Sequence, residues 1–418
     1  MMGTVNPGDG TLALRAGQMI DGTGAEPQRD MVVTLERGVI TKVGPAAAVP
    51  RGVPILDLSE YTVLPGLINA HAHTILPGDG TPFAEWMDMP DEFLLLQAHA
   101  NALSSLHSGV TTIRDCGGKG TIMFRLRDAI RAGIVSGPRF VLSGRASTIT
   151  GGHCRYFGGE ADGVEGMRLA ARQLLKEGAD FIKIMASGGG TVGTYSQFPS
   201  YEIEEMRAAI MEAHKIRKLA SCHCIATESI SRALDAGTDH IEHCSFMAPD
   251  TTWQYDEAIA QRVASAGVYV TATLQVSMDS MVATRERYEQ GIATEEEARM
   301  MPLMPKRSEN GIANMHYLHE LGVPIVAGND AGWRYTGFDD FYQELELLSH
   351  AGMTPIEAIH AATGRAATAC HLDGIVGTIA AGCVADLLVV REDPATTLGA
   401  LKDPAMVLQS GLTIVDRR

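Results

Sequence analysis

The stretch Pro65-Gly-Leu-Ile-Asn-Ala-His-Ala-His73 decides the fold, because in it an apolar run with strand character ends in a pair of histidines. Side chains at positions i and i+2 of a strand face the same side. His71 and His73 therefore point the same way at the carboxyl end of the strand, where together they could hold one divalent metal ion. A single His-x-His pair is weak evidence, so the interpretation depends on how the other strands end.

Apolar β-type runs recur along the middle of the chain and alternate with helical patterns. The strands are predicted at Thr62–Ala70, Thr111–Asp115, Arg139–Ser143, Asp180–Ile184, Leu219–His223, His240–His243, Val268–Ala272 and Pro324–Gly328. Helical patterns lie between them, at Phe93–His107, Met167–Lys176, Ile203–Ile216, Ile230–Ala236 and Met315–Leu321. Eight strands alternating with helices over roughly 250 to 300 residues favour an α/β protein with a (β/α)8 barrel of the TIM type. A doubly wound open sheet is the structural alternative.

The two ends of the chain resemble each other and differ from the middle. Both consist of short β-branched runs separated by glycine-containing turns, which is typical of strand-turn-strand structure. We predict a small β-sandwich domain built from residues 1–64 and 371–418, around a barrel of residues 65–370. A capping box at Thr354-Pro-Ile-Glu357 begins a helix, expected to reach about Thr368, that leads back to the β tail.

Composition limits the classes of partner. Acidic residues number 50 and basic residues 34, so the net charge is 34 − 50 = −16. This charge argues against nucleic acid and against anionic membranes as partners. There is no apolar run of about 18 residues and no signal-peptide pattern at the start. The seven scattered cysteines fit reduced thiols, so we expect a cytoplasmic enzyme that acts on small molecules.

Lys183 lies in an otherwise apolar predicted strand, Ala179-Asp-Phe-Ile-Lys-Ile-Met185. A lysine cation is costly to bury there, and a desolvated lysine loses its proton. A neutral amine can add carbon dioxide and become a carbamate, an anionic ligand with two oxygens that suits a bridge between two metals. Taken alone, a salt-bridged or snorkelling lysine would be the simpler interpretation.

Three further residues of metal-ligand type follow predicted strands. His223 ends the fifth strand, His243 ends the sixth, and Asp330 follows the eighth. The ends of barrel strands converge on one face, so these side chains are expected to meet His71 and His73 there. Spacing alone does not choose between His243 and His240.

Three cysteines flank the candidate histidines and could suggest a thiolate zinc site. Alternation along the strand turns Cys222 and Cys224 away from the face that His223 uses. We therefore predict that these two, and Cys244, are small packed residues.

In order and strand placement, the candidate ligands resemble those of the binuclear amidohydrolase superfamily: His71, His73, Lys183, His223, His243 and Asp330. The resemblance implies the barrel, the two-ended β-sandwich, two divalent metal ions (zinc above all) and hydrolysis of amide-like bonds. It places His71, His73 and Asp330 on the first metal, and His223 and His243 on the second. The Lys183 carbamate bridges both, Asp330 acts as general base and then acid, and the family pattern selects His243 over His240.

Within the superfamily the chain is most similar to the Xaa-Pro dipeptidase-like branch, which cleaves dipeptides, N-acyl amino acids and ochratoxin-type amides. The supporting stretches are Gly109–Asp115, Thr150–His153 and Lys183–Gly189. His153, on the loop after the third strand, could hydrogen-bond a substrate carbonyl or carboxylate. Arg155 could pair with a carboxylate through its planar guanidinium, and Tyr195 lies at the same face. Cys154, Arg155 and the stretch Thr191–Pro199 depart from the branch pattern, which leaves the substrate open.

Other functions remain alternatives. A deaminase on the same barrel is disfavoured by Lys183 and by the missing His-x-x-Glu pattern after the fifth strand, since Glu228 is explained as a helix-start charge. Ring-opening hydrolysis of an imidazolone or hydantoin is a closer rival, and aryl-urea or carbamate hydrolysis is another. A non-catalytic assembly protein that kept the barrel should have lost ligands.

The sequence leaves the role of one long insertion open. The methionine-rich segment Leu274–Lys306 is predicted to pack on the barrel or on another subunit of a homo-oligomer, or else to cover the substrate as a lid.

Overall fold

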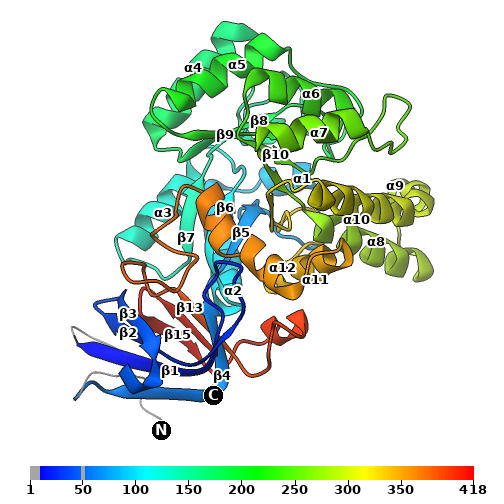
Figure 1. Ribbon diagram of the computed structural model, residues 1–418. Helices are drawn as coiled ribbons and strands as arrows, with labels where there is room; N and C mark the ends of the chain where they lie inside the picture. Colours follow the sequence, from blue (N-terminus) through cyan, green and yellow to red (C-terminus); the bar gives the residue numbers. More distant parts are fainter. Residues whose placement is uncertain (1–9, 49–51) are drawn as a thin grey trace.

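Three sheets organise the computed structural model, which describes residues 10–48 and 52–418. Two parallel sheets, of five and three strands, occupy the middle of the molecule, and a seven-stranded mixed sheet lies at one end (Figure 1). The protein is therefore of the α/β class. Within the described residues, every helix is too short or too polar to span a lipid bilayer.

The predicted strands of the middle region are present. From the second strand on, the observed ends differ from the predicted ends by no more than two residues. They form the sheets β5-β6-β7 and β12-β11-β10-β9-β8. Parallel bridges between Ser147 and Ile184 and between Ala72 and Ala331 join the neighbouring edges of the two sheets. The bounds are β5 (Leu67–Ala72), β6 (Val110–Asp115), β7 (Arg139–Leu142), β8 (Phe181–Met185), β9 (Leu219–His223), β10 (His240–Glu242), β11 (Tyr269–Thr271) and β12 (Ile325–Val326).

The first predicted strand, Thr62–Ala70, was wrong as a single element. The structure divides it at Gly66 into β4 (Ile55–Pro65), which belongs to the mixed sheet, and β5. A Cβ atom on Gly66 would lie 2.2 Å from Thr111 Oγ1, so only glycine lets the chain pass β6 this closely. The amide of Gly66 donates to the carbonyl of Asp386, which fixes the crossing point.

Helices follow the parallel strands and cover them. In Figure 1, α4 to α7 lie over β8 to β10, on the side away from the mixed sheet. The expected helix from Thr354 to Thr368 is broken into two, because Thr363 has the non-helical angles φ −136° and ψ −102°. The helices are α1 (Phe83–Met87), α2 (Asp91–His107), α3 (Ile122–Arg131), α4 (Gly163–Glu177), α5 (Ile203–His214), α6 (Thr227–Ala236), α7 (Glu257–Ala266), α11 (Tyr342–His350), α12 (Pro355–Ala361) and α13 (Gly364–Ala369).

Strands from both chain ends pair in the mixed sheet, whose order is β15-β14-β13-β4-β1-β2-β3. Leucines and valines of these strands, such as Leu14, Leu58 and Leu387, form an apolar core of their own. The strands are β1 (Thr11–Met19), β2 (Gln28–Glu36), β3 (Val39–Pro45), β13 (Leu387–Val390), β14 (Met406–Gln409) and β15 (Leu412–Asp416). The division into domains stays a prediction, and residues 1–9 and 49–51 of the predicted N-terminal part lie outside the described residues.

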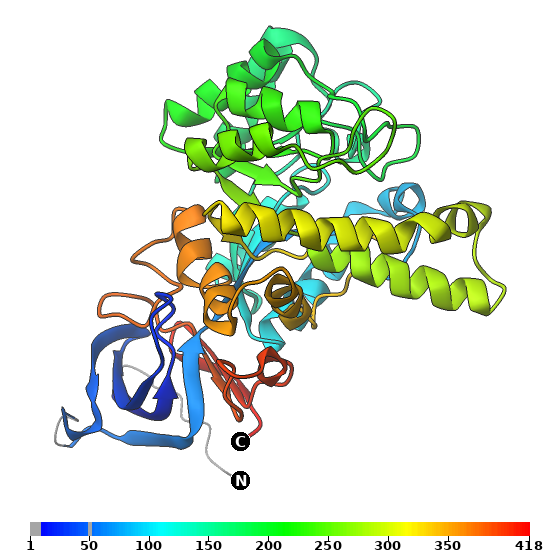
Figure 2. The ribbon, with the colours of Figure 1, turned by 45° about the vertical axis from the view of Figure 1, so that its right-hand side comes forward.

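The long insertion after β11 forms a helical arm. It consists of α8 (Leu274–Glu289), α9 (Glu295–Met300), a 3-10 turn (Met301–Leu303) and α10 (Met304–Glu320). Figure 2 shows α8 and α10 side by side, reaching out from the rest of the molecule. The base of this arm lies beside the carboxyl ends of the parallel strands, so its residues are available to the site described next.

Candidate metal centre

Five imidazole rings stand in a row where the parallel strands end. Their successive centroid distances, from His73 to His71, His243, His223 and His153, are 5.5, 5.0, 4.6 and 4.7 Å. The structure thus brings together the histidines that the sequence singled out from four different strands or loops. His240 lies elsewhere, since its Nε2 donates to the carbonyl of Ala369, so the geometry favours His243 over its rival.

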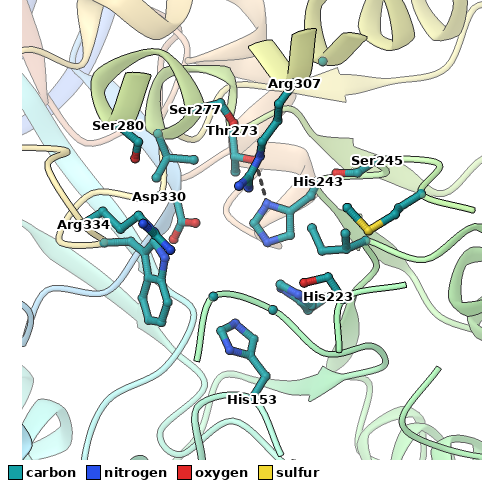
Figure 3. A pocket seen from close by; sticks show the side chains of 18 of the residues that line it. His153, His223, His243, Ser245, Thr273, Ser277, Ser280, Arg307, Asp330 and Arg334 are labelled. Atoms are coloured by element: carbon teal, nitrogen blue, oxygen red, sulfur yellow. Dashed lines mark hydrogen bonds between the residues drawn. The ribbon is translucent and has the colours of Figure 1, made fainter. Parts of the chain in front are cut away.

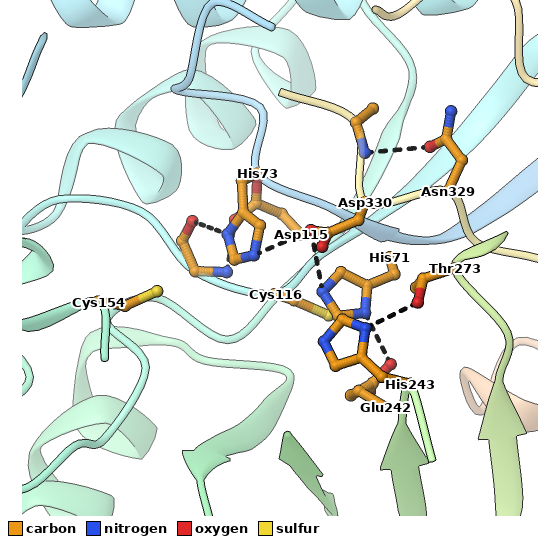
Figure 4. Close-up of polar contacts among 12 residues, drawn as sticks. His71, His73, Asp115, Cys116, Cys154, Glu242, His243, Thr273, Asn329 and Asp330 are labelled. Atoms are coloured by element: carbon orange, nitrogen blue, oxygen red, sulfur yellow. Dashed lines mark hydrogen bonds and ion pairs between the residues drawn. The ribbon is translucent and has the colours of Figure 1, made fainter. Parts of the chain in front are cut away.

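His71, His73 and Asp330 form a compact group of donor atoms. Their donor atoms lie within 4.8 Å of one another, and all three residues are buried. Asp330 Oδ1 is 3.5 Å from His71 Nε2 and 3.4 Å from His73 Nε2 (Figure 4). His71 Nε2 and Asp330 Oδ1 have no hydrogen-bond partner although both are buried. Buried lone pairs without donors are costly, and a cation between them would remove that cost.

The partners of the imidazoles fix which nitrogen is free. His71 Nδ1 donates to Glu242 Oε2 at 2.8 Å, and His73 Nδ1 donates to the carbonyl of Gly117 at 2.9 Å. A neutral imidazole has one N–H and one lone pair, so both rings present Nε2 to Asp330. This arrangement suits metal binding, because a ligating histidine generally donates its other N–H to a carboxylate or carbonyl.

The second pair of histidines is oriented in the same way. His223 Nε2 donates to the carbonyl of Gly188 at 3.1 Å, which leaves Nδ1 as the lone pair. Thr273 Oγ1 donates to the carbonyl of Ala272 and accepts from His243 Nδ1 at 2.7 Å, which leaves Nε2. The two acceptors lie in loops: Gly188 follows β8, the neighbour of β9, and Thr273 follows β11, the neighbour of β10. The orientations of the His223 and His243 rings therefore depend on how those loops pack.

Lys183 belongs to β8, the strand next to β9, which ends in His223. Its side chain, in the middle of β8, is fully buried, and Nζ has no hydrogen-bond partner. The charge of Lys183 is among the influences that lower the pKa of His71, His223 and His243. A buried amine without a hydrogen-bond partner is the feature that a carbamate would explain.

Glu242 is the functional residue that the sequence analysis missed. Its carboxylate is fully buried and accepts from His71, from Arg114 Nη1 at 2.7 Å and from Ser221 Oγ at 2.7 Å. The signal was present, since Glu242 is an acid within the predicted strand His240–His243 and directly precedes His243. Because Glu242 acts through His71, it is a positioning residue.

Burial keeps these imidazoles neutral. It lowers the pKa of His73 to about 4, and it lowers the pKa of His71, His223 and His243 well below the ordinary value. Burial raises the pKa of Asp330 to about 7. Nitrogen lone pairs are therefore available at neutral pH, which is the state that metal binding requires. The group of His71, His73 and Asp330 fits a divalent cation.

A pocket of about 400 Å³ opens over this centre (Figure 3). His153 lines it, with Nδ1 at 2.8 Å from Thr191 Oγ1. Arg155 and Tyr195 do not line it: the Arg155 guanidinium donates to Val192 and Tyr156, and Tyr195 is 68% exposed. Their role in substrate binding stays a prediction. Residues of the arm supply much of the wall, and they include Ser277, Ser280, Arg307 and Asn314.

The cysteines near the centre are packed side chains, as predicted. Cys222, Cys224 and Cys244 are fully buried and unbonded to one another. Burial raises the pKa of each thiol, so none is a ready thiolate ligand.

Comparison with known proteins agrees with this geometry. A model described as the amidohydrolase family matches residues 62–412. The chain belongs to the amidohydrolase family. Its resemblance to the Xaa-Pro dipeptidase-like and ochratoxinase-like members is also confirmed.

Three relatives of this amidohydrolase cover nearly its whole length. Ochratoxinase of Aspergillus niger is 26% identical over 94% of this chain and 83% of its own. A solved Xaa-Pro dipeptidase with methionine bound in its active site has a TM-score of 0.85 and 26% identity, over 96% of this chain and 99% of that one. A solved prolidase in complex with N-methylphosphonate-L-proline has a TM-score of 0.84 and 26% identity, over 98% and 100%.

Replacing Glu242 with Gln removes the negative charge between Arg114 and His71. We expect a loss of about 3–5 kcal/mol in the free energy of unfolding, because Arg114 becomes an uncompensated buried cation. We also expect zinc affinity to fall about 10- to 100-fold, because His71 loses its orienting carboxylate. Urea unfolding and zinc titration of the chelator-treated protein measure the two effects. Glu228→Gln, at an exposed pair with Arg232, is the matched control, and equal behaviour of the two variants would contradict the assignment.

The His73 ring of the metal-free protein should stay neutral far into the acid range. Burial penalises the charged form, so the proton should bind with a midpoint near pH 4, where an unfolded chain binds it near 6.5. The ring-carbon NMR signal of His73, assigned with His73→Asn, follows this titration. A midpoint near 6.5 in the folded protein would show that the ring is hydrated.

Proposed function

We propose that this amidohydrolase is a metal-dependent enzyme that cleaves a peptide-like amide bond in a small molecule. The proposed substrates are dipeptides or N-acyl amino acids, with ochratoxin-like amides included. The observation that carries the proposal is the group of His71, His73 and Asp330, which has buried donor atoms without partners and lies at a pocket that His223 and His243 also line.

Each ligand has a proposed place. His71, His73 and Asp330 would hold one divalent cation, and His223 and His243 would hold a second. Lys183, as a carbamate formed with carbon dioxide, would stand between the two. Zinc is the preferred candidate, because nitrogen and carboxylate ligands in a buried set suit it.

Two bound cations would supply Lewis acidity, which polarises an amide carbonyl and makes water acidic enough to attack it near neutral pH. The chain's own residues then handle protons and position. A carboxyl group whose pKa lies near 7 can both take and give a proton, so Asp330 would accept one on its carboxylate and pass it to the leaving nitrogen. His153, whose ring lines the pocket 4.7 Å from that of His223, would hydrogen-bond the substrate.

The architecture is part of the proposal. We infer that the two parallel sheets, joined at both edges by bridges, act as one closed (β/α)8 barrel of residues 65–370. The two-ended β-sandwich would then comprise residues 1–64 and 371–418. In such a barrel the catalytic residues come from the carboxyl ends of several strands, which is where His71, His223 and Asp330 lie.

The relatives support the substrate class. One binds methionine and another a phosphonate analogue of an acyl-proline, and a third is named for its action on ochratoxin. A pocket of about 400 Å³ has room for a molecule of that size. Ring-opening of a cyclic amide is the alternative, because such substrates would use the same centre.

Bound metal and substrate range test the proposal together. We expect about two metals per chain and cleavage of at least one N-acyl amino acid or dipeptide by the metal-loaded protein. A chelator should abolish this activity, and zinc, manganese or cobalt with bicarbonate should restore it. The panel also contains aryl amides and ring amides. Cleavage of ring amides alone would favour the cyclic alternative, and absence of both metal and activity would point to a non-catalytic protein.

Lys183→Ala should abolish measurable turnover, because the bridging anion is lost. A small carboxylate such as formate can enter the space that the side chain leaves, so partial recovery of activity with added formate is expected. Lys176→Ala, at an exposed position of α4, is the control and should keep full activity. Turnover in Lys183→Ala equal to that of the control would refute the bridging role.

A further inference from the structure

The wall of the pocket carries three arginines, two from the arm and one from the loop after β12. Arg299, Arg307 and Arg334 line the pocket, while among the described residues its lining contains a single carboxylate, Asp330. The chain as a whole carries a net charge of −16, so this local excess of arginine is opposite to the general composition. A cationic wall facing a hydrolytic centre points to a substrate that carries negative charge away from the bond to be cleaved.

Arg307 directs its guanidinium into the pocket (Figure 3). It comes from α10, is half-buried, and Figure 3 shows it beside His243 and Thr273. Its guanidinium carbon lies 5.8 Å from the centroid of the Trp253 ring. Within residues 10–48 and 52–418 its guanidinium forms no hydrogen bond or ion pair. A guanidinium has five N–H groups to satisfy, so this arrangement leaves them for a ligand.

The Arg307 side chain is partly shielded from water and is still a cation. Burial, and then the like charge of Arg334, lower the pKa of Arg307 to about 10. It remains charged at neutral pH, and its loss of water strengthens any bond to an anion.

The helix surface around Arg307 leaves space for that anion. Gly311 and Asn314 follow at i+4 and i+7, on the same face of α10, and both line the pocket. Gly311 has no side chain to fill the position next to the guanidinium. Asn314 is held by its own bond, from Nδ2 to the carbonyl of Ser245 at 3.1 Å, so it does not compete for the space.

The arginine that the sequence favoured is engaged elsewhere. The Arg155 guanidinium lies 4.4 Å from the Tyr156 ring centroid and donates to Tyr156 Oη at 2.6 Å and to the Val192 carbonyl at 3.1 Å. Arg155 therefore braces its loop.

We propose that Arg307 binds a carboxylate of the substrate, and that the enzyme selects acids over their uncharged counterparts. This inference rests on the proposed function, since it takes the same pocket to be the substrate site. The planar guanidinium donates two parallel N–H bonds to the two carboxylate oxygens, a geometry that a lysine cannot reproduce. The arm thus supplies specificity, while the strand ends supply the chemistry.

Binding and turnover are measured separately. Calorimetry of the metal-loaded protein uses a panel of N-acetyl-L-amino acids and the matching carboxamides, which differ only in the charge of the terminal group. The proteins are the wild type, Arg307→Gln, Arg307→Lys and Lys306→Gln. Lys306 is the matched control, because it is the neighbouring cation on α10, is exposed and does not line the pocket. The same pairs are then assayed for kcat and KM.

We expect the wild type and Lys306→Gln to bind the acid at least about 10-fold more tightly than its carboxamide. Arg307→Gln should bind the acid about 10- to 100-fold more weakly and the carboxamide unchanged, and Arg307→Lys should fall between. In turnover, the loss should appear in KM more than in kcat.

Three results would overturn the carboxylate site: no member of the panel binds the wild type, acid and carboxamide bind it equally, or Arg307→Gln binds the acid as the wild type does. An equal loss for acid and carboxamide would show a structural role instead. If acids bind through Arg307 but no amide is cleaved, the proposed function fails and the carboxylate site stands.

Discussion

The buried carboxylate of Glu242 is the interaction on which the centre depends. It accepts from groups on three other strands: His71 of β5, Arg114 of β6 and Ser221 of β9. A carboxylate in an apolar interior is tolerated only when its lone pairs are satisfied by donors or cations. The strands therefore have to meet in one register, and that register brings His71 Nε2 to Asp330.

The requirement that buried polar groups have partners also explains how the other histidine rings are oriented. Each ring is tied by one N–H to a fixed acceptor, and burial keeps the opposite nitrogen as a lone pair. Two ligand residues also sit in backbone conformations with positive φ, 70° at His243 and 60° at Asp330. Such conformations cost about 1–3 kcal/mol in non-glycine residues and persist where surrounding structure requires them. Here the strained turns aim the side chains back over the strand ends.

In the proposed enzyme, chemistry and selectivity come from different parts of the molecule. The ligand-type residues sit on the ends of rigid parallel strands, whereas Arg307 and Asn314 come from an arm inserted after β11. Strand ends hold side chains precisely because the hydrogen-bonded sheets fix their spacing, while an inserted arm can vary without disturbing them. On the proposed function, this division would let one centre serve many amides, with the arm deciding which of them enters.

The sequence by itself determined the local features: the strands of the middle region, the capping box at Thr354 and the candidate ligands at strand ends. These depend on alternation and capping between near neighbours, which the order of residues records directly. It did not show the break at Gly66, because that depends on contact with Thr111 of a different strand. It also did not show that Glu242 orients His71, or that Arg307 rather than Arg155 faces the pocket. Those pairings join residues far apart in the chain, so only the packing of strands, loops and arm decided them.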